Sequence, residues 1–163
     1  MHSTVFIGLG SNLADPIHQI KTALRTLHDI EQTQLVKSSS LYRSPPMGPP
    51  DQPAYINAVA QLETTLTPLS LLMALQVIEI NQGRVRQGER WGPRTLDLDI
   101  LLFDDLVLDT PALQIPHPGL HERSFVLYPL SDVAPPDLPI PGHGRLAKLR
   151  EQCPATGLEK LAE

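Results

Sequence analysis

The order of strand and helix patterns between residues 3 and 103 constrains the fold of this chain more than any other feature. Residues 3–10 predict a first strand, which the turn residues Gly10, Ser11 and Asn12 end. Asp15 as N-cap, with Pro16 at the first helical position, predicts a helix to about residue 28. The apolar residues that recur in it at helical spacing are Ile17, Ile20, Ala23, Leu24 and Leu27.

Two more strands and a second helix follow. Residues 33–42 and 55–63 predict strands, and residues 43–53 between them hold so many prolines that they exclude a helix or a central strand. Thr67 with Pro68 predicts the start of a helix that ends near Gly83. The side chains expected on its buried stripe are Leu69, Leu72, Leu75, Val77 or Ile78, and Ile80.

The fourth strand begins at Asp97 and continues into an apolar run, residues 100–103, that is typical of a central strand buried on both faces. A return strand at residues 106–108 is expected to pair with it, followed by short helices at residues 125–130 and 144–152 and a loosely packed tail. This order predicts the α+β class, a ferredoxin-like antiparallel sheet with helices packed on one face, plus a C-terminal hairpin and short helices. We expect residues 1–163 to form a single domain.

Composition narrows the function classes. The chain has 13 basic and 18 acidic residues, a balance that argues against a general nucleic-acid-binding surface. Four of its arginines nevertheless fall within residues 84–94, a local positive patch that suits a small anionic ligand. The single cysteine, Cys153, excludes an internal disulfide, and no segment resembles a signal peptide or a membrane span. We therefore expect a soluble, cytoplasmic protein.

Asp97 and Asp99 form the most informative pair of residues. On a strand their side chains project from one face about 7 Å apart. Magnesium takes one or two carboxylates and completes its shell with water and phosphate oxygens, so the pair could hold a metal-bound polyphosphate that Arg90 and Arg94 contact. The alternative is that these four residues form exposed ion pairs of little energetic value.

Three further side chains have two interpretations each. Tyr55 and Asn57 alternate on one strand face, where they could stack on and hydrogen-bond a flat heterocycle, or serve as a core residue and a turn ligand. His117 lies in a loop with Arg123 and Phe125, and a lone loop histidine is more often a surface or packing residue than a ligand.

Residues 90–101 resemble the motif of the 6-hydroxymethyl-7,8-dihydropterin pyrophosphokinase family of the folate pathway. The resemblance extends, in order, over almost the whole chain and thins after about residue 135. The additional matching segments are Gly10-Ser11-Asn12-Leu13, Ser44-Pro45-Pro46, Gly48-Pro49, Gln52-Pro53 with Tyr55-Ile56-Asn57, and Pro116-His117 with Arg123 and Phe125.

The resemblance implies that the diphosphate of ATP passes to the hydroxymethyl group of a reduced pterin, with release of AMP and a requirement for Mg²⁺, two ions being expected. The implied catalytic residues are Arg84, Arg94, Asp97 and Asp99, of which Asp97 and Asp99 bind the metal. The implied ATP-binding residues are Gln76, Glu79, Arg86, Arg90, Ile100, His117 and Arg123. The implied pterin-binding residues are Ser44, Pro45, Met47, Tyr55, Asn57, Trp91 and Phe125.

The sequence departs from the family pattern at Ala112, Gln114 and Pro118, on the ribose and phosphate side of ATP, which affects nucleotide affinity more than the reaction. Two other classes compete with the family reading: another magnesium-dependent nucleotide enzyme, of nucleotidyltransferase or cyclase type, and a ferredoxin-like RNA-binding module. The family reading implies ATP and the pterin as the only partners, without nucleic acid or membrane. We also expect a monomer.

Overall fold

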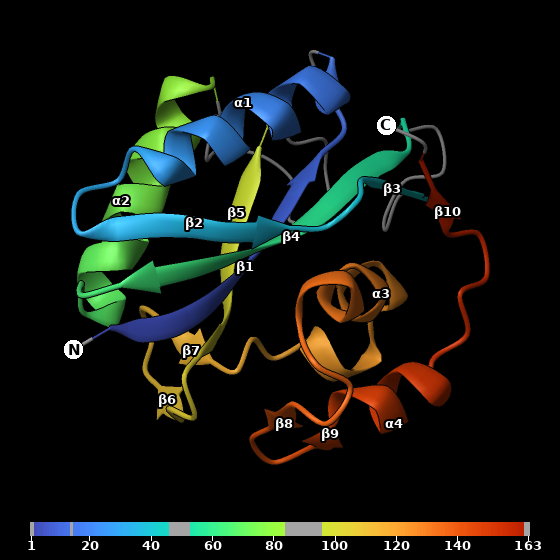
Figure 1. The fold of residues 1–163 in the computed structure, drawn as a ribbon. Coiled ribbons are helices and arrows are strands. Elements are labelled where there is room, and N and C mark those ends of the chain that lie inside the picture. The colour runs from blue at the N-terminus through green and yellow to red at the C-terminus, as the bar shows by residue number, and fades with distance from the viewer. Residues whose placement is uncertain (1, 14, 46–52, 84–95, 162–163) are drawn as a thin grey trace.

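The computed structural model describes residues 2–13, 15–45, 53–83 and 96–161, and within them the main sheet has six strands (Figure 1). Its strands are β1 (Ser3–Ser11), β2 (Thr33–Ser38), β3 (Tyr42–Ser44), β4 (Tyr55–Thr64), β5 (Asp97–Phe103) and β10 (Glu159–Lys160). The helices are α1 (Pro16–His28), α2 (Pro68–Asn81), α3 (Ser124–Val133), α4 (Leu146–Glu151) and the 3-10 turn η1 (Leu120–Glu122). Two small ladders pair β6 (Leu108–Asp109) with β7 (Gln114–Ile115) and β8 (Pro139–Ile140) with β9 (Gly144–Arg145).

The sheet confirms the predicted α+β, ferredoxin-like class. Its strands run β10-β3-β4-β1-β5, β2 also pairs with β4, and all of these pairings are antiparallel. The first strand–helix–strand unit and the second interlock because β1 and β4 are neighbours in the middle of the sheet. Helices α1 and α2 cover one face, as expected (Figure 1).

The other face of the sheet is covered too, so the prediction of helices on one face alone is wrong. A second buried cluster joins Phe6 and Val59 of the sheet to the apolar faces of α3 and α4. Figure 1 shows these two helices on the side of the sheet opposite α1 and α2. The first cluster holds Val5, Ile7 and Leu9 of the same strand against α1 and α2. The strand β1 therefore alternates between two cores, and the sheet is the middle layer of three.

Strand β5 lies at the edge of the sheet, and the prediction of a central strand is wrong. A register shift between Phe6 and Ile7 lets the consecutive residues Leu101 and Leu102 both reach the second core, so the apolar run is buried although the strand is at the edge. Two backbone groups on its outer edge form hydrogen bonds with other elements. Leu98 N–H donates to Glu79 Oε2 at 2.8 Å, and the Leu101 carbonyl accepts from the backbone N–H of His117 at 3.0 Å.

Other local predictions are corrected. The strand expected at residues 33–42 is two strands, because three residues between Ser38 and Tyr42 oppose two of β4 and Ser39 bonds Val59 with both its backbone and its hydroxyl. The expected return strand pairs with β7 rather than β5, whose outer edge His117 already occupies. The tail is not loose: β10 extends the sheet beside β3.

The buried stripe predicted for α2 is confirmed only in part, although Thr67 caps the helix as predicted and the helix ends before Gly83. Leu75 and Ile78 are buried as predicted, whereas Leu69 and Ile80 are not. The helix buries Leu71, Leu75, Ile78 and Glu79. Four large apolar side chains of its outer face are instead more than half exposed: Leu69, Met73, Val77 and Ile80. The helix is apolar on all sides, so periodicity alone does not identify the side that faces the sheet.

Among the residues that the structure describes, no helix combines the length and the apolar character needed to cross a bilayer.

Candidate active site

Two glycines of β1 open a cavity on the face of the sheet that carries α3. Gly10 lies between Asn57 of β4 and Asp97 of β5, and Gly8 lies between Val59 and Asp99. Residues directly opposite each other share a face, so bare backbone separates the amide side of the cavity from the carboxylate side. The cavity has a volume of about 340 Å³.

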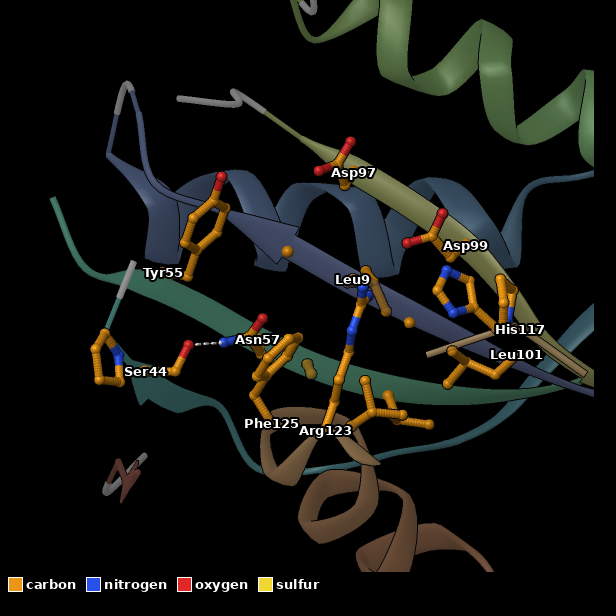
Figure 2. Close-up of a pocket in the computed structure, with 17 residues that line it drawn as sticks. Leu9, Ser44, Tyr55, Asn57, Asp97, Asp99, Leu101, His117, Arg123 and Phe125 are labelled. Carbon is orange, nitrogen blue, oxygen red and sulfur yellow. Dashed lines mark hydrogen bonds between the residues drawn. The ribbon is translucent and has the colours of Figure 1, made fainter. Parts of the chain in front are cut away.

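Strands β1, β3, β4 and β5 and helix α3 all contribute to the lining of this cavity. Figure 2 shows Tyr55 and Asn57 on β4, the two carboxylates on β5, and Phe125 at the start of α3. Asn57 is buried and its Nδ2 donates to Ser44 Oγ at 2.7 Å, which fixes the amide beside the glycine floor. A flat, partly polar molecule fits such a space, because aromatic rings border it and a buried amide lies at its base.

His117 stands at the far end of the cavity and is electrically neutral at pH 7. Burial, followed by the positive charge of Arg123, lowers its pKa from 6.5 to about 4. Gly119 N–H donates to His117 Nδ1 at 3.1 Å, so in the neutral ring the proton is on Nε2. The ring therefore presents an N–H donor, which can bond a phosphate oxygen without adding a full charge.

A second cavity of about 390 Å³ lies between α2, β5 and residues 110–118. Leu72, Leu98, Ile100 and Leu113 give it apolar walls, which suit a purine-sized ring. Asp99, His117 and Pro118 line both cavities. The two spaces therefore meet beside a carboxylate and an imidazole donor, an arrangement suited to bringing two small substrates together at a charged group.

The carboxylates of Asp97 and Asp99 suit magnesium. Both line the first cavity from one face of β5, Asp97 being half-buried and Asp99 exposed. Among the described residues no group of three or more His, Cys, Asp and Glu side chains could hold a metal ion. A pair of carboxylates fits Mg²⁺, which completes its shell with water and phosphate oxygens, better than it fits a metal held by protein ligands alone.

The structure brings together most of the predicted site residues that it describes. Those that line the first cavity are Ser44, Pro45, Tyr55, Asn57, Asp97, Asp99, His117, Arg123 and Phe125. Ile100 lines the second. Gln76 and Glu79 line neither, and Glu79 is 2% exposed with its carboxylate bonded to the backbone of β5. The predicted residues that lie outside the described parts of the chain are Met47, Arg84, Arg86, Arg90, Trp91 and Arg94.

The sequence reading missed the floor of the site. Gly8 was assigned no role beyond the strand, and Gly10 none beyond a turn in a segment that matches the family, although two glycines at alternate positions of an apolar strand leave one face without side chains. Ala112, Gln114 and Pro118, noted as departures from the family pattern, line the second cavity.

Known proteins resemble the chain in sequence and in fold. The family model described as 7,8-dihydro-6-hydroxymethylpterin-pyrophosphokinase matches residues 6–135. The 2-amino-4-hydroxy-6-hydroxymethyldihydropteridine pyrophosphokinase of Pseudomonas aeruginosa is 53% identical over 161 residues, 99% of this chain and 98% of that protein. The Haemophilus influenzae protein of the same name is 49% identical over 149 residues, 91% of this chain and 92% of that protein.

The similarity in fold extends to more distant proteins. A crystal structure of Plasmodium falciparum HPPK-DHPS with pteroate superposes with a TM-score of 0.74 at 15% identity, over 93% of this chain and 42% of that one. At this identity the likeness establishes the fold alone. The chain spans less than half the length of that solved chain.

Proposed function

The chain belongs to the 7,8-dihydro-6-hydroxymethylpterin-pyrophosphokinase family, and from this membership we propose how its two adjoining cavities divide the reaction. The protein is a pyrophosphokinase of folate biosynthesis, which transfers the diphosphate of ATP to the hydroxymethyl group of 6-hydroxymethyl-7,8-dihydropterin. ATP is its cosubstrate. The competing readings, a nucleotidyltransferase or cyclase and an RNA-binding module, are not favoured.

The first cavity is proposed to bind the pterin. Its ring would stack between Tyr55 and Phe125, and Asn57, fixed by Ser44, would bond the polar edge of the ring. Pro45 closes the same end of the cavity. Met47 and Trp91 are proposed to contribute further contacts. The half-buried state of Tyr55 and Phe125 supports this proposal, because each residue keeps exposed surface that a ligand can cover.

The second cavity is proposed to bind the adenosine of ATP, with Ile100 as part of its apolar wall. The triphosphate would then extend past His117 and Arg123 toward the pterin. His117 would donate Nε2–H to a phosphate oxygen, and Arg123 would offer its planar fork of N–H groups. Gln76, Glu79, Arg86 and Arg90 are proposed as further contacts of ATP.

Asp97, which lines the first cavity, and Asp99, which lines both, would hold Mg²⁺, two ions being proposed. When bound, the metal neutralises phosphate charge and polarises the hydroxyl of the pterin. Because both carboxylates are on one short stretch of strand, whose backbone Glu79 anchors, they offer the metal a rigid platform. Arg84 and Arg94 are proposed to stabilise the charge that develops on the transferred phosphates.

Transfer of a diphosphate group fixes the bonds that change. The hydroxymethyl oxygen bonds to the β-phosphorus, the bond between that phosphorus and the oxygen of the α-phosphate breaks, AMP leaves, and the hydroxyl proton passes to solvent. Phosphoryl transfer of this kind depends on in-line placement and on charge stabilisation more than on covalent help from the protein. We assign no general base among the described side chains.

The remaining expectations stand as proposals. We propose that residues 1–163 act as a single catalytic domain, because one sheet carries both cavities, and that the protein is cytoplasmic. We also propose a monomer. The apolar outer face of α2 makes light scattering coupled to gel filtration the appropriate test, and a dimer mass at low micromolar concentration would contradict a monomer.

The observation that carries the proposed division of the site is the wall of Asp99, His117 and Pro118 that both cavities share. Purified protein should be incubated with magnesium, ATP and the hydroxymethyl dihydropterin, and the products separated by chromatography. AMP and pterin diphosphate should form in equal amounts, and neither should form when the pterin is omitted. Release of ADP, or of AMP without pterin, would contradict the proposal.

A further inference from the structure

Gly119 lies between His117 and Arg123, immediately before η1, and its backbone does not require glycine. Its φ of −100° and ψ of 1° are available to other residues. A glycine at such a position therefore has another explanation, which its surroundings supply.

The guanidinium of Arg123 occupies the space that a side chain at position 119 would take. A Cβ placed on Gly119 would lie 2.5 Å from Arg123 Nε, 2.6 Å from Cζ and 2.9 Å from Nη2. Ordinary contacts between heavy atoms begin at about 3.5 Å. The guanidinium therefore lies close against Gly119, and its Cζ is 5.7 Å from the centroid of the Phe125 ring.

The same glycine also contacts the imidazole. The backbone N–H of Gly119 donates to His117 Nδ1. The backbone N–H of His117 donates to the Leu101 carbonyl of β5. Residues 117–119 are thus fixed to the strand that carries the two carboxylates. The Gly119 backbone consequently provides a fixed surface against which Arg123 can be placed relative to Asp97 and Asp99.

We propose that Gly119 is a positioning residue: its lack of a side chain determines where the Arg123 guanidinium lies, at the end of the first cavity where the ATP phosphates are proposed to bind. The proposal rests on the role assigned above to Arg123 in binding ATP phosphates. It adds that the residue type at 119 tunes the use of MgATP without itself touching a substrate.

Gly119→Ala should move the guanidinium while leaving the backbone in place. A shift of about 1 Å in a group that positions a reactant can lower the rate by up to about 100-fold. We expect kcat/KM for MgATP to fall roughly 10- to 100-fold, and the thermal midpoint to stay near the wild-type value. Glu122→Ala is the matched control, since Glu122 is exposed at the end of η1, the short helix that Gly119 precedes, and it should change neither quantity.

A double-mutant cycle with Arg123→Ala provides the test. If Gly119 acts through Arg123, Gly119→Ala should cause no further loss of kcat/KM in the Arg123→Ala background. An equal fold-loss in both backgrounds would overturn the proposal. If Gly119→Ala lowers the thermal midpoint, the double variant should restore it, because the clash is removed. A double variant that stays unstable would show that the fold itself needs the glycine, and would also overturn the proposal.

A readout independent of activity separates this proposal from the role of Arg123. Full activity of Arg123→Ala alone would refute the role in ATP binding. The Nε–H resonance of Arg123, assigned by its loss in Arg123→Lys, should still shift in Gly119→Ala and stay in place in Glu122→Ala. An unshifted resonance in Gly119→Ala would refute the positioning role, whatever the activity.

Discussion

Replacing His117 by asparagine should flatten the dependence of stability on pH between about 6.5 and 4. Burial and Arg123 lower the pKa of His117 from 6.5 to about 4 in the folded protein. Between these values the unfolded chain binds a proton that the folded protein does not, so the free energy of unfolding falls as the pH falls. The stability that depends on neutral His117 is fully present above pH 6.5 and is lost by about pH 4.

The size of the effect follows from the two pKa values. A pKa that falls from 6.5 to about 4 corresponds to about 3 kcal/mol of unfolding free energy. A domain of ordinary stability has about 5–15 kcal/mol, so this loss is a large part of the total. His117→Asn keeps an acceptor near Gly119 N–H and removes the titration.

Urea unfolding at pH 7.5, 6.5, 5.5 and 4.5 measures the prediction. The unfolding free energy of the wild type minus that of His117→Asn should fall steadily as the pH falls below 6.5. The contributions of carboxylates that titrate in both proteins cancel in this difference. His2→Asn, at an exposed histidine near the start of the chain, controls for the loss of one histidine. Parallel curves for wild type and His117→Asn across the whole range would refute the reasoning.

Three other predictions concern the two carboxylates, the glycine floor of the first cavity and the edge strand β5. Asp97→Ala and Asp99→Ala should each lower turnover by more than about 100-fold, because the loss is in metal binding, with an unchanged circular dichroism spectrum; a variant of full rate would exclude its carboxylate as a ligand. Gly10→Val should weaken pterin binding roughly tenfold or more in a fluorescence titration, because it fills the floor, whereas Gly10→Ala, whose Cβ would meet Asn57 Oδ1 at 3.5 Å, should bind nearly normally; equal affinities would show that the floor is not part of the pterin site. Glu79→Leu should lower the unfolding free energy by about 1–3 kcal/mol, because Leu98 N–H loses its acceptor, and Glu79→Gln should lower it less; equal losses would contradict a role for this bond.

Much of the fold was predictable because local signals agree with tertiary packing. Pro16 and Thr67 mark helix starts where the structure has them, and the clean alternation of residues 55–63 makes β4 evident. The same holds for Tyr55, Asn57, Asp97 and Asp99, since alternation on two strands is enough to give each pair a common face.

The remaining features depend on contacts that no local pattern encodes. The apolar run of β5 is typical of a central strand, yet β5 is an edge strand. A register shift lets its apolar side chains be buried, and two hydrogen bonds from outside the sheet pair groups of its outer edge. The buried side of α2 could not be read because the helix is apolar all round. The two cavities meet at Asp99 and His117 only because the chain after β7 returns alongside β5. Contacts between segments so far apart in the sequence are not visible in a local pattern.

The central claim is that one cavity takes the pterin, the other takes the adenosine, and Asp97 and Asp99 lie between them. A crystal structure with magnesium, a non-hydrolysable ATP analogue and the hydroxymethyl dihydropterin tests it most directly. The account predicts the pterin ring between Tyr55 and Phe125, the adenine against Ile100, and magnesium bound to both carboxylates. A pterin bound outside the first cavity, or phosphates that approach neither carboxylate, would contradict it.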